Sequence, residues 1–289
     1  TIFVDATHVK AAANRKKTKN ILVAKKSARF YDEKLKAEIN ADRIAHGKKP
    51  LKEKDDKDDR DDNDRNSGSG QMDMSELKEQ KQSITDPESG WFHKGEHKEV
   101  FAYSIETACD ENGWILDYSV HPGNEHDSKT FPELYEKLKK YAIKTMVMDA
   151  GYKNPAIAKL LIDEAITPLF PYKRPMTKKG FFRKHEYVYD EYYDCYLCPG
   201  DQILKYATTN REYKSDGNLC ANCPYLSQCT ESKNHVKVLT RHIWEGYMEI
   251  CEDIRHTIGM KELYGKRKET IERNFGTAKE HHAMRYTQL

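Results

Sequence analysis

The chain has 289 residues, which at roughly 100–200 residues per domain predicts one large domain or two modest ones. Charged residues make up 33% and hydrophobic residues 37%, so we expect a polar protein whose apolar residues are concentrated in a few strands and helices. The net charge of +2 comes without any run of about 18 apolar residues and without a basic and then apolar leader, which excludes a membrane span and a secretory signal and predicts a cytoplasmic protein.

Residues 1–30 are expected to begin with a buried strand and to continue as a basic stretch. The strand, Ile2 to Val9, is apolar at its start and is then interrupted by Asp5. Between Ala6 and Phe30 there are eight Lys or Arg residues and no acidic residue. Basic stretches bind phosphate backbones by releasing counterions, so this one suits a nucleic-acid partner; an ordinary solvated surface is the alternative.

Residues 31–95 are predicted to form a charged, flexible insertion between two ordered parts. Residues 52–65 hold eight acids and five bases, and residues 66–70 read Asn-Ser-Gly-Ser-Gly. A segment with so much charge buries too little apolar surface to fold, and Gly/Ser-rich chains behave as flexible coils. Little of the core is therefore expected from this segment.

Residues 96–174 are predicted to form the core of an α/β domain, and this core opens with a hairpin. The runs 98–108 and 114–120 have the composition of strands. Asn112-Gly113 lies between them, and this pair is a strong signal for a tight β-turn. With the strand that carries Asp5, the sheet has at least three strands.

The second half of this core predicts helices that alternate with strands. A helix capped by Asp127 or Ser128 is expected first, followed by a near-continuous apolar strand over 144–149. Asn154-Pro155 then has the cap and first-turn residues of another helix, and residues 166–170 read as a further strand. This alternation predicts a sheet with crossover connections.

Residues 175–255 interrupt the pattern and are interpreted as an insertion with a cysteine-rich module. A second basic stretch, with six Lys or Arg and no acid, runs from Pro171 to His185. Two CxxC pairs about 20 residues apart follow, and without an export signal they favour zinc over disulfides, because thiolates stay reduced in the cytosol. We expect a zinc-ribbon-like clamp whose structural Zn²⁺ is held by Cys195, Cys198, Cys220 and Cys223, with Cys229 able to replace one of them.

Residues 256–289 are predicted to complete the core with a helix. Its apolar face recurs at helical spacing in Ile271, Phe275 and Ala278. The neighbouring face carries Glu272, Gly276 and Lys279. The glycine would let another backbone or a phosphate approach this face closely.

Three acids are candidates for catalysis. Asp5 and Asp149 each follow an apolar strand, and ligand sites in open α/β sheets lie beyond the carboxyl ends of strands. With Glu272 they would repel one another unless a hard cation such as Mg²⁺ or Mn²⁺ neutralises them. Two such ions about 4 Å apart suit phosphodiester cleavage and transfer. The alternative is that the aspartates cap turns and that Glu272 pairs with Lys268 on a helix surface.

Four strings in order resemble the bacterial insertion-sequence transposases of the DDE type. They are IFVDATHVKA, VMDAGYKNPAIAKLL, the DCYLCPG and CANCPYLSQCT pair, and YGKRKETIERNFGTAKEHHAMRYT. The resemblance spans most of the chain outside residues 31–90. It implies a ribonuclease-H-like core, two Mg²⁺ ions and a catalytic triad at Asp5, Asp149 and Glu272.

The resemblance also implies DNA contacts from the last helix. These enzymes carry a Tyr, Arg, Glu and Lys signature, which maps here to Tyr264, Arg267, Glu272 and Lys279. Lys268 occupies the position at which the arginine is usual. We therefore expect Arg267 or Lys268 to contact the phosphate near the scissile bond and Lys279 to contact DNA one turn further along.

The function expected from these features is a DNA transposase that cleaves a phosphodiester at the element end and joins the 3′-hydroxyl to target DNA. The alternatives are an inactive, truncated remnant that only binds DNA, and a ribonuclease-H-like nuclease that acts on hybrids. A copy truncated at both termini is expected, because relatives carry a recognition region before the first aspartate and continue after the glutamate helix. DNA synapsis implies a homo-oligomer, and the DNA substrate implies association with the bacterial nucleoid.

Overall fold

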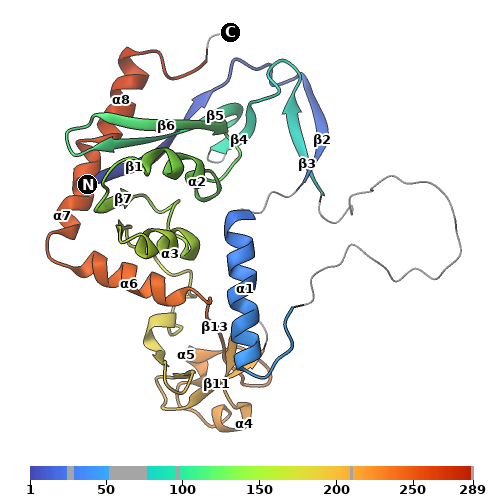
Figure 1. Cartoon of the computed structure of the whole chain (residues 1–289). Helices are drawn as coiled ribbons and strands as arrows, with labels where there is room; N and C mark the ends of the chain where they lie inside the picture. Colours follow the sequence, from blue (N-terminus) through green and yellow to red (C-terminus); the bar gives the residue numbers. More distant parts are fainter. Residues whose placement is uncertain (25–28, 52–76, 95–97, 209–210, 288–289) are drawn as a thin grey trace, which may run out of the picture. The chain divides into compact units, whose positions relative to one another are not determined.

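The computed structural model describes residues 1–24, 29–51, 77–94, 98–208 and 211–287. The chain divides into two compact units (Figure 1). Unit 1 comprises Thr1–Lys34, Lys52–Pro171 and Tyr247–Leu289, and unit 2 comprises Leu35–Leu51 and Tyr172–Gly246. Within the described ranges no helix has the length and apolar character that crossing a bilayer requires.

Unit 1 is built on an eight-stranded mixed sheet with the order β2-β3-β4-β5-β1-β7-β8, in which β6 also pairs with β5. The strands are β1 (Ile2–Lys10), β2 (Thr18–Ala24), β3 (Leu77–Ser83), β4 (Gly90–Lys94), β5 (Lys98–Asp110), β6 (Ile115–Pro122), β7 (Thr145–Met148) and β8 (Thr167–Leu169). Strand β1 pairs antiparallel with β5 and parallel with β7, and β7 pairs parallel with β8. The series β6-β5-β1-β7-β8 fits a ribonuclease-H-like core, so the expected mixed α/β sheet is confirmed.

Helices cover both faces of this sheet. They are α2 (Asp127–Leu138), α3 (Pro155–Asp163), α6 (Glu245–His256), α7 (Met260–Gly265) and α8 (Ile271–His281). Side chains of β1 alternate between the two faces of the sheet. Val4 lies in the cluster to which α2 and α3 contribute, whereas Phe3 lies in the cluster with Ile271 and Phe275 of α8. Residues 3, 5 and 7 therefore share the face of the sheet that α8 covers.

The local signals of the core are confirmed at the hairpin and at α3. Gly113 turns the chain between β5 and β6 with a φ of +85°, in the region that favours glycine. The Asn154 side chain accepts a hydrogen bond from the Ile157 backbone N–H at 2.9 Å and caps α3, with Pro155 in its first turn. The cap predicted for α2 is wrong in detail, because His126 caps this helix by accepting from the backbone N–H of Ser128 at 3.2 Å.

The segment predicted as a flexible insertion contains regular structure. Helix α1 (Arg29–Ala45) and strands β3 and β4 fall within residues 31–95, except for the first two residues of α1, whereas residues 52–76 lie outside the described residues. Polar contacts with residues far along the chain hold the end of α1 in unit 2. Arg211 pairs with Asp42 of the helix, and the imidazole of His46, directly after the helix, lies 2.6 Å from the Asp194 carboxylate. Some charged side chains of this segment therefore form specific ion pairs with residues of unit 2.

Unit 2 contains an antiparallel sheet with the order β13-β12-β11-β10-β9. Its elements are β9 (Val188–Asp190), β10 (Cys195–Leu197), β11 (Ile203–Thr208), β12 (Glu212–Lys214), α4 (Gly217–Cys220), α5 (Leu226–Cys229) and β13 (Val238–Thr240). Its core is rich in tyrosine and is formed by Tyr187, Tyr196, Leu204, Tyr213 and Leu239. Large aromatic side chains thus supply most of the buried area of a small sheet.

Candidate active site

Asp5 and Asp149 occupy equivalent positions where the parallel pairing of β1 and β7 ends, Asp5 within β1 and Asp149 directly after β7. Val4 of β1 is the register partner of Met148 of β7, and each aspartate is the next residue. Phe3 and Val147 belong to the same buried cluster, so strand alternation turns the side chains two residues later, Asp5 and Asp149, towards the same side. The expected convergence of two carboxylates at one sheet edge follows from this register.

Arg267 holds the Asp5 carboxylate from a buried position. This arginine lies in the 3₁₀ turn η3 (Lys266–Lys268), and its Nη2 is 2.6 Å from Asp5 Oδ2. Its Nη1 donates to the hydroxyl of half-buried Tyr264 at 2.8 Å. Lys268, in contrast, is exposed. Of the two basic residues considered for the position beside the carboxylates, the structure brings Arg267 there.

The pKa of Asp5 is set by its burial and by the charges of three neighbouring residues. Burial raises the pKa of Asp5 to about 6, the charge of Arg267 opposes this rise, and the charges of Asp149 and Glu272 add to it. The other two acids of the predicted triad thus both lie near enough to act on Asp5. Glu272 is exposed in the first turn of α8, on the side of the sheet that Asp5 faces.

Lys279 fixes α8 along β1. Its Nζ donates to the hydroxyl of Thr7, which is two residues after Asp5 and on the same face of β1. Helix α8 also packs Ile271 and Phe275 into the cluster that contains Phe3. The helix that carries Glu272 and Lys279 is therefore attached to β1 twice, by the Lys279 hydrogen bond to Thr7 and by the apolar contacts with Phe3.

Asp127 is a further carboxylate at this site that sequence reasoning interpreted as a helix cap. Because His126 supplies the cap, the carboxylate of Asp127 is available for another role. A Cβ atom on Gly151 would lie 2.8 Å from Asp127 Oδ2 and 3.0 Å from Asp149 Oδ1, so both carboxylates border this glycine. Burial and the charge of Asp149 raise the pKa of Asp127.

A buried glutamate connects the elements that carry these aspartates. Glu106 of β5 is fully buried and accepts hydrogen bonds from the hydroxyls of Thr130 at 2.6 Å and Tyr152 at 3.3 Å. Thr130 lies one turn after Asp127, and Tyr152 lies three residues after Asp149. Burial raises the pKa of Glu106 to about 7. Sequence reasoning missed it, and its only signal was an acid inside an otherwise β-rich run.

The donor chemistry of the site fits a hard divalent cation. Carboxylate oxygens are the ligands that Mg²⁺ and Mn²⁺ prefer. Burial raises the pKa of Asp5 and of Asp127, and the charge of Asp149 adds to the rise at both. Among the described residues, however, no three His, Cys, Asp or Glu side chains are already arranged around one point as metal ligands.

The family model of the transposase DDE domain matches residues 1–289. The chain belongs to this family. Its members are DNA-cleaving enzymes that use divalent metal ions, in agreement with the carboxylates at the sheet edge. Neither the curated proteins nor the solved structures include a match to the chain.

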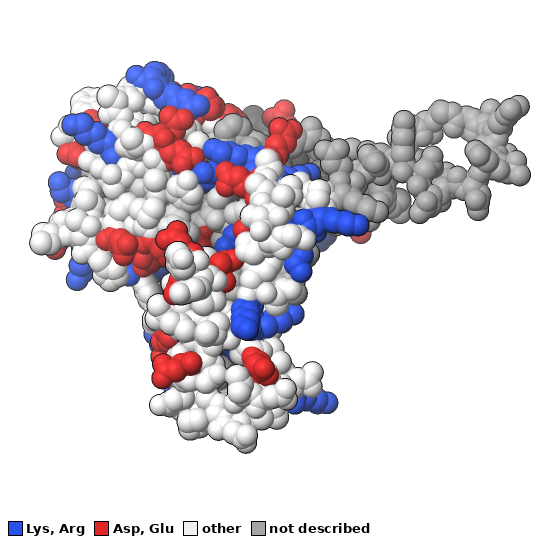
Figure 2. Space-filling model, turned by 60° about the horizontal axis from the view of Figure 1, so that its bottom comes forward, with Lys and Arg blue, Asp and Glu red and all other residues white. Residues whose placement is uncertain are grey.

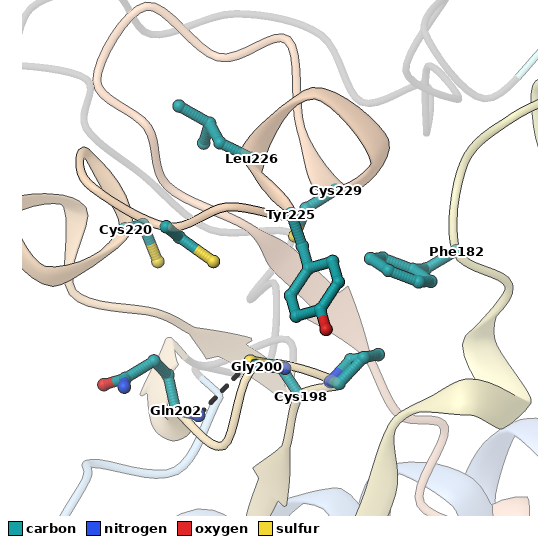
Figure 3. A pocket seen from close by; sticks show the side chains of 10 residues that line it. Phe182, Cys198, Gly200, Gln202, Cys220, Tyr225, Leu226 and Cys229 are labelled. Atoms are coloured by element: carbon teal, nitrogen blue, oxygen red, sulfur yellow. Dashed lines mark hydrogen bonds between the residues drawn. The ribbon is translucent and has the colours of Figure 1, made fainter.

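Five of the seven cysteines of this transposase domain lie in unit 2, and Cys109 and Cys251 lie in unit 1. Three of the expected zinc ligands, Cys198, Cys220 and Cys223, line one cavity together with Cys229 (Figure 3). Cys195 is not among the residues that line it. None of the seven cysteines forms a disulfide.

The two basic stretches of the transposase domain are exposed where they are described. Lys16, Lys17 and Lys19 are exposed in unit 1, and Lys173 and Lys179 are exposed in unit 2. Residues 25–28 of the first stretch lie outside the described residues. Figure 2 shows basic and acidic side chains interspersed over one face of the molecule. No continuous basic surface is visible over the described residues on this face.

Proposed function

We propose that this chain cleaves DNA at the end of an insertion element and joins the released 3′-hydroxyl to target DNA. The observation that carries the proposal is the position of Asp5 and Asp149 where the parallel pairing of β1 and β7 ends, with Arg267 buried against Asp5 and Glu272 close enough to raise the pKa of Asp5. Such a set of acids from three distant parts of the chain suits phosphodiester chemistry, because it presents negative charge that only a cation or a phosphate-bound cation satisfies.

Asp5, Asp149 and Glu272 would hold Mg²⁺ or Mn²⁺ in this proposal. Asp5 and Asp149 would share one position, and Glu272 would complete a second. When bound, such ions activate the attacking water or 3′-hydroxyl and neutralise the departing oxygen. No covalent bond between the protein and DNA is required.

The remaining residues position these groups. Arg267 favours the ionised form of Asp5 and fixes its orientation through a charge-assisted hydrogen bond. From this place its guanidinium lies beside the position where a scissile phosphate would bind. Lys279 and exposed Lys268 would contact the DNA backbone on either side, and Tyr264 would support Arg267 through its hydroxyl.

Asp127 would act as a fourth carboxylate of the site. Its oxygens border Gly151 together with those of Asp149, and the absence of a side chain at residue 151 lets the two acids approach each other. The charge of Asp149 disfavours the ionised form of Asp127, and a cation between the two would offset this repulsion. Asp127 would therefore bind or orient the ion that Asp149 holds.

Binding of the element ends would use the exposed basic stretches, and pairing of two ends would require two copies of the chain. Lysines of the first stretch lie just before and within β2. Those of the second stretch lie at the start of the Tyr172–Gly246 segment of unit 2. Phosphate contacts of this kind fix register without reading sequence.

The experiment that tests the proposal is cleavage and joining of a duplex oligonucleotide with the element's end sequence in Mg²⁺. Wild type should nick the end and transfer it to a target duplex, and Asp149→Asn should abolish both reactions. Asp253→Asn is the matched control, because this aspartate is exposed on α6. A wild-type chain that binds the end but never cleaves it would support the DNA-binding remnant. Cleavage restricted to the RNA strand of a hybrid would support the nuclease.

A further inference from the structure

Four thiols of unit 2 surround one small cavity. The cavity has a volume of about 20 Å³, which is room for a single ion or water molecule, and it is lined by Cys198, Cys220, Cys223 and Cys229. Figure 3 shows Cys198, Cys220 and Cys229 around this space, on separate segments of the chain. Four sulfur atoms therefore surround a space that a single ion could occupy.

These thiols come from two parts of unit 2 that are separate in the sequence, the residue after β10 and the segment from α4 to α5. Cys198 follows β10, whereas Cys220 ends α4 and Cys223 lies in the turn that begins with the hydrogen bond from its backbone N–H to the Cys220 carbonyl at 3.0 Å. A Cβ on Gly200 would lie 3.3 Å from Cys223 Sγ and 3.8 Å from Cys198 Sγ. The glycine thus leaves space in which sulfurs from both ends approach the same point.

Hydrogen-bond donors are already directed at the sulfurs. The backbone N–H groups of Gly200 and Gln202 both donate to Cys198 Sγ at 3.3 Å (Figure 3). The Tyr187 hydroxyl lies 3.3 Å from Cys229 Sγ. Donors around metal-bound ligands orient them and stabilise their charge, and neutral thiols need no such support.

Lys237 places a positive charge at the same end of the module. Its Nζ donates to the Cys229 carbonyl at 2.9 Å and lies 5.4 Å from the centre of the Tyr187 ring. Burial raises the pKa of the Cys229 thiol, and the Tyr187 hydroxyl and the charge of Lys237 oppose this rise. A donor and a cation therefore both lie beside this cysteine.

Cys195 is excluded from the cavity by strand alternation. Tyr196 and Cys198 pack together in the tyrosine-rich core of unit 2, and residues two apart on a strand share a face. Cys195 is buried on the opposite face of β10, where its register partners are Asp190 and Lys205. The first CxxC pair therefore supplies one thiol to the cavity.

We propose that Cys198, Cys220, Cys223 and Cys229 bind one Zn²⁺ ion, and that Cys195 stays a buried thiol outside the site. Four thiolates in a tetrahedron are the ligand set that structural zinc prefers. Four Zn–S bonds form, the thiol protons pass to solvent, and no electron is transferred. Rotation about the Cα–Cβ bonds completes the tetrahedron, since no three ligands in the described residues are yet placed around one point. The ion would join the β10 end of the module to α4 and α5.

The test counts zinc in the full chain without DNA, so it does not depend on strand transfer. The chain is loaded with ZnCl₂, desalted and measured by inductively coupled plasma mass spectrometry. Wild type and Cys195→Ser should retain about one zinc per chain, whereas Cys229→Ser should lose it. Retention of zinc by Cys229→Ser, its loss from Cys195→Ser, or a wild type that takes up no zinc would overturn the proposal.

A second measurement uses wild type alone, so that a variant that fails to fold does not decide the outcome. Native chain is alkylated with iodoacetamide before and after chelation, and each cysteine is quantified by peptide mass spectrometry. Cys198, Cys223 and Cys229 are partly exposed, so only a bound ion should protect them. Their reactivity should rise severalfold on chelation, with no rise at buried Cys109 or Cys251. Equal reactivity in both states, or disulfide-linked peptides among these cysteines, would overturn the zinc site.

Discussion

Arg267 and Asp5 form a short ion pair, 2.6 Å between Nη2 and Oδ2, although 262 positions of numbering separate them. The arginine lies in the turn just before α8, so this contact joins the middle of β1 to the start of the helix that carries Glu272. The ion pair thus fixes the relative position of two of the three proposed catalytic acids.

Substitution Arg267→Gln should remove both the ion pair and the activity. We expect the free energy of unfolding to fall by on the order of 3 kcal/mol, because a largely buried carboxylate loses its partner. DNA cleavage should be lost at temperatures at which circular dichroism shows a folded chain. Lys268→Gln, which alters an exposed neighbour, should change stability by less than about 0.5 kcal/mol. An active Arg267→Gln chain would contradict the assigned role.

Substitution Asp127→Asn should lower activity without lowering stability. Removal of one of two acids that border Gly151 relieves repulsion, so thermal stability should stay constant or rise. Cleavage should fall about 10- to 100-fold, and more metal should be needed for half-maximal rate. Glu136→Gln, at an exposed position of α2, is the control. Equal metal dependence in wild type and Asp127→Asn would show that Asp127 has no part in ion binding.

Glu106 should make stability depend on pH. Its pKa is raised from 4.5 to about 7, so the folded chain keeps the neutral form while the unfolded chain ionises. This contribution is fully present below pH 4.5, and it is lost as pH rises through about 7, by up to roughly 3 kcal/mol. Urea unfolding of Glu106→Gln between pH 5 and 8 should show a smaller loss than wild type. Parallel pH curves for the two chains would contradict an ionisation-linked role.

Substitution Gly276→Ala should affect the stability of the fold and the affinity for DNA in opposite directions. No atom lies within 4 Å of a Cβ at this helical residue, so alanine should raise the free energy of unfolding by about 0.5–1 kcal/mol. If DNA approaches α8 over this glycine, affinity for an end duplex should fall severalfold. Gly246→Ala is the control, since its Cβ also meets open space and it lies in α6. Unchanged affinity in Gly276→Ala, measured by fluorescence anisotropy, would place the DNA elsewhere.

The parts of the site that could be predicted are those encoded locally. Asp5 and Asp149 each end an apolar run, and strand register alone brings such residues together at a sheet edge. Asn154 and Pro155 announce a helix start within two residues. Glu272 has no local signature among 47 acidic residues, and only its resemblance to a family helix identified it.

The parts that could not be predicted depend on distant partners. Helix α1 has a charged sequence, and its contacts, such as His46 with Asp194, join residues 148 positions apart. Asp127 looked like a cap because aspartate is common there, but the neighbouring imidazole competes for the same N–H. Spacing placed Cys195 with Cys198, whereas the pleat of β10 sends them to opposite faces.

The proposed catalytic acids Asp5 and Glu272 lie far apart in the sequence, so the ribosome makes them at different times. At about 5–20 residues per second, translation from Asp5 to Glu272 takes on the order of tens of seconds. Throughout that interval the nascent polypeptide on the ribosome holds Asp5 without its arginine and without the glutamate. In the proposed mechanism, a nascent chain therefore cannot cleave DNA until Glu272 has been made.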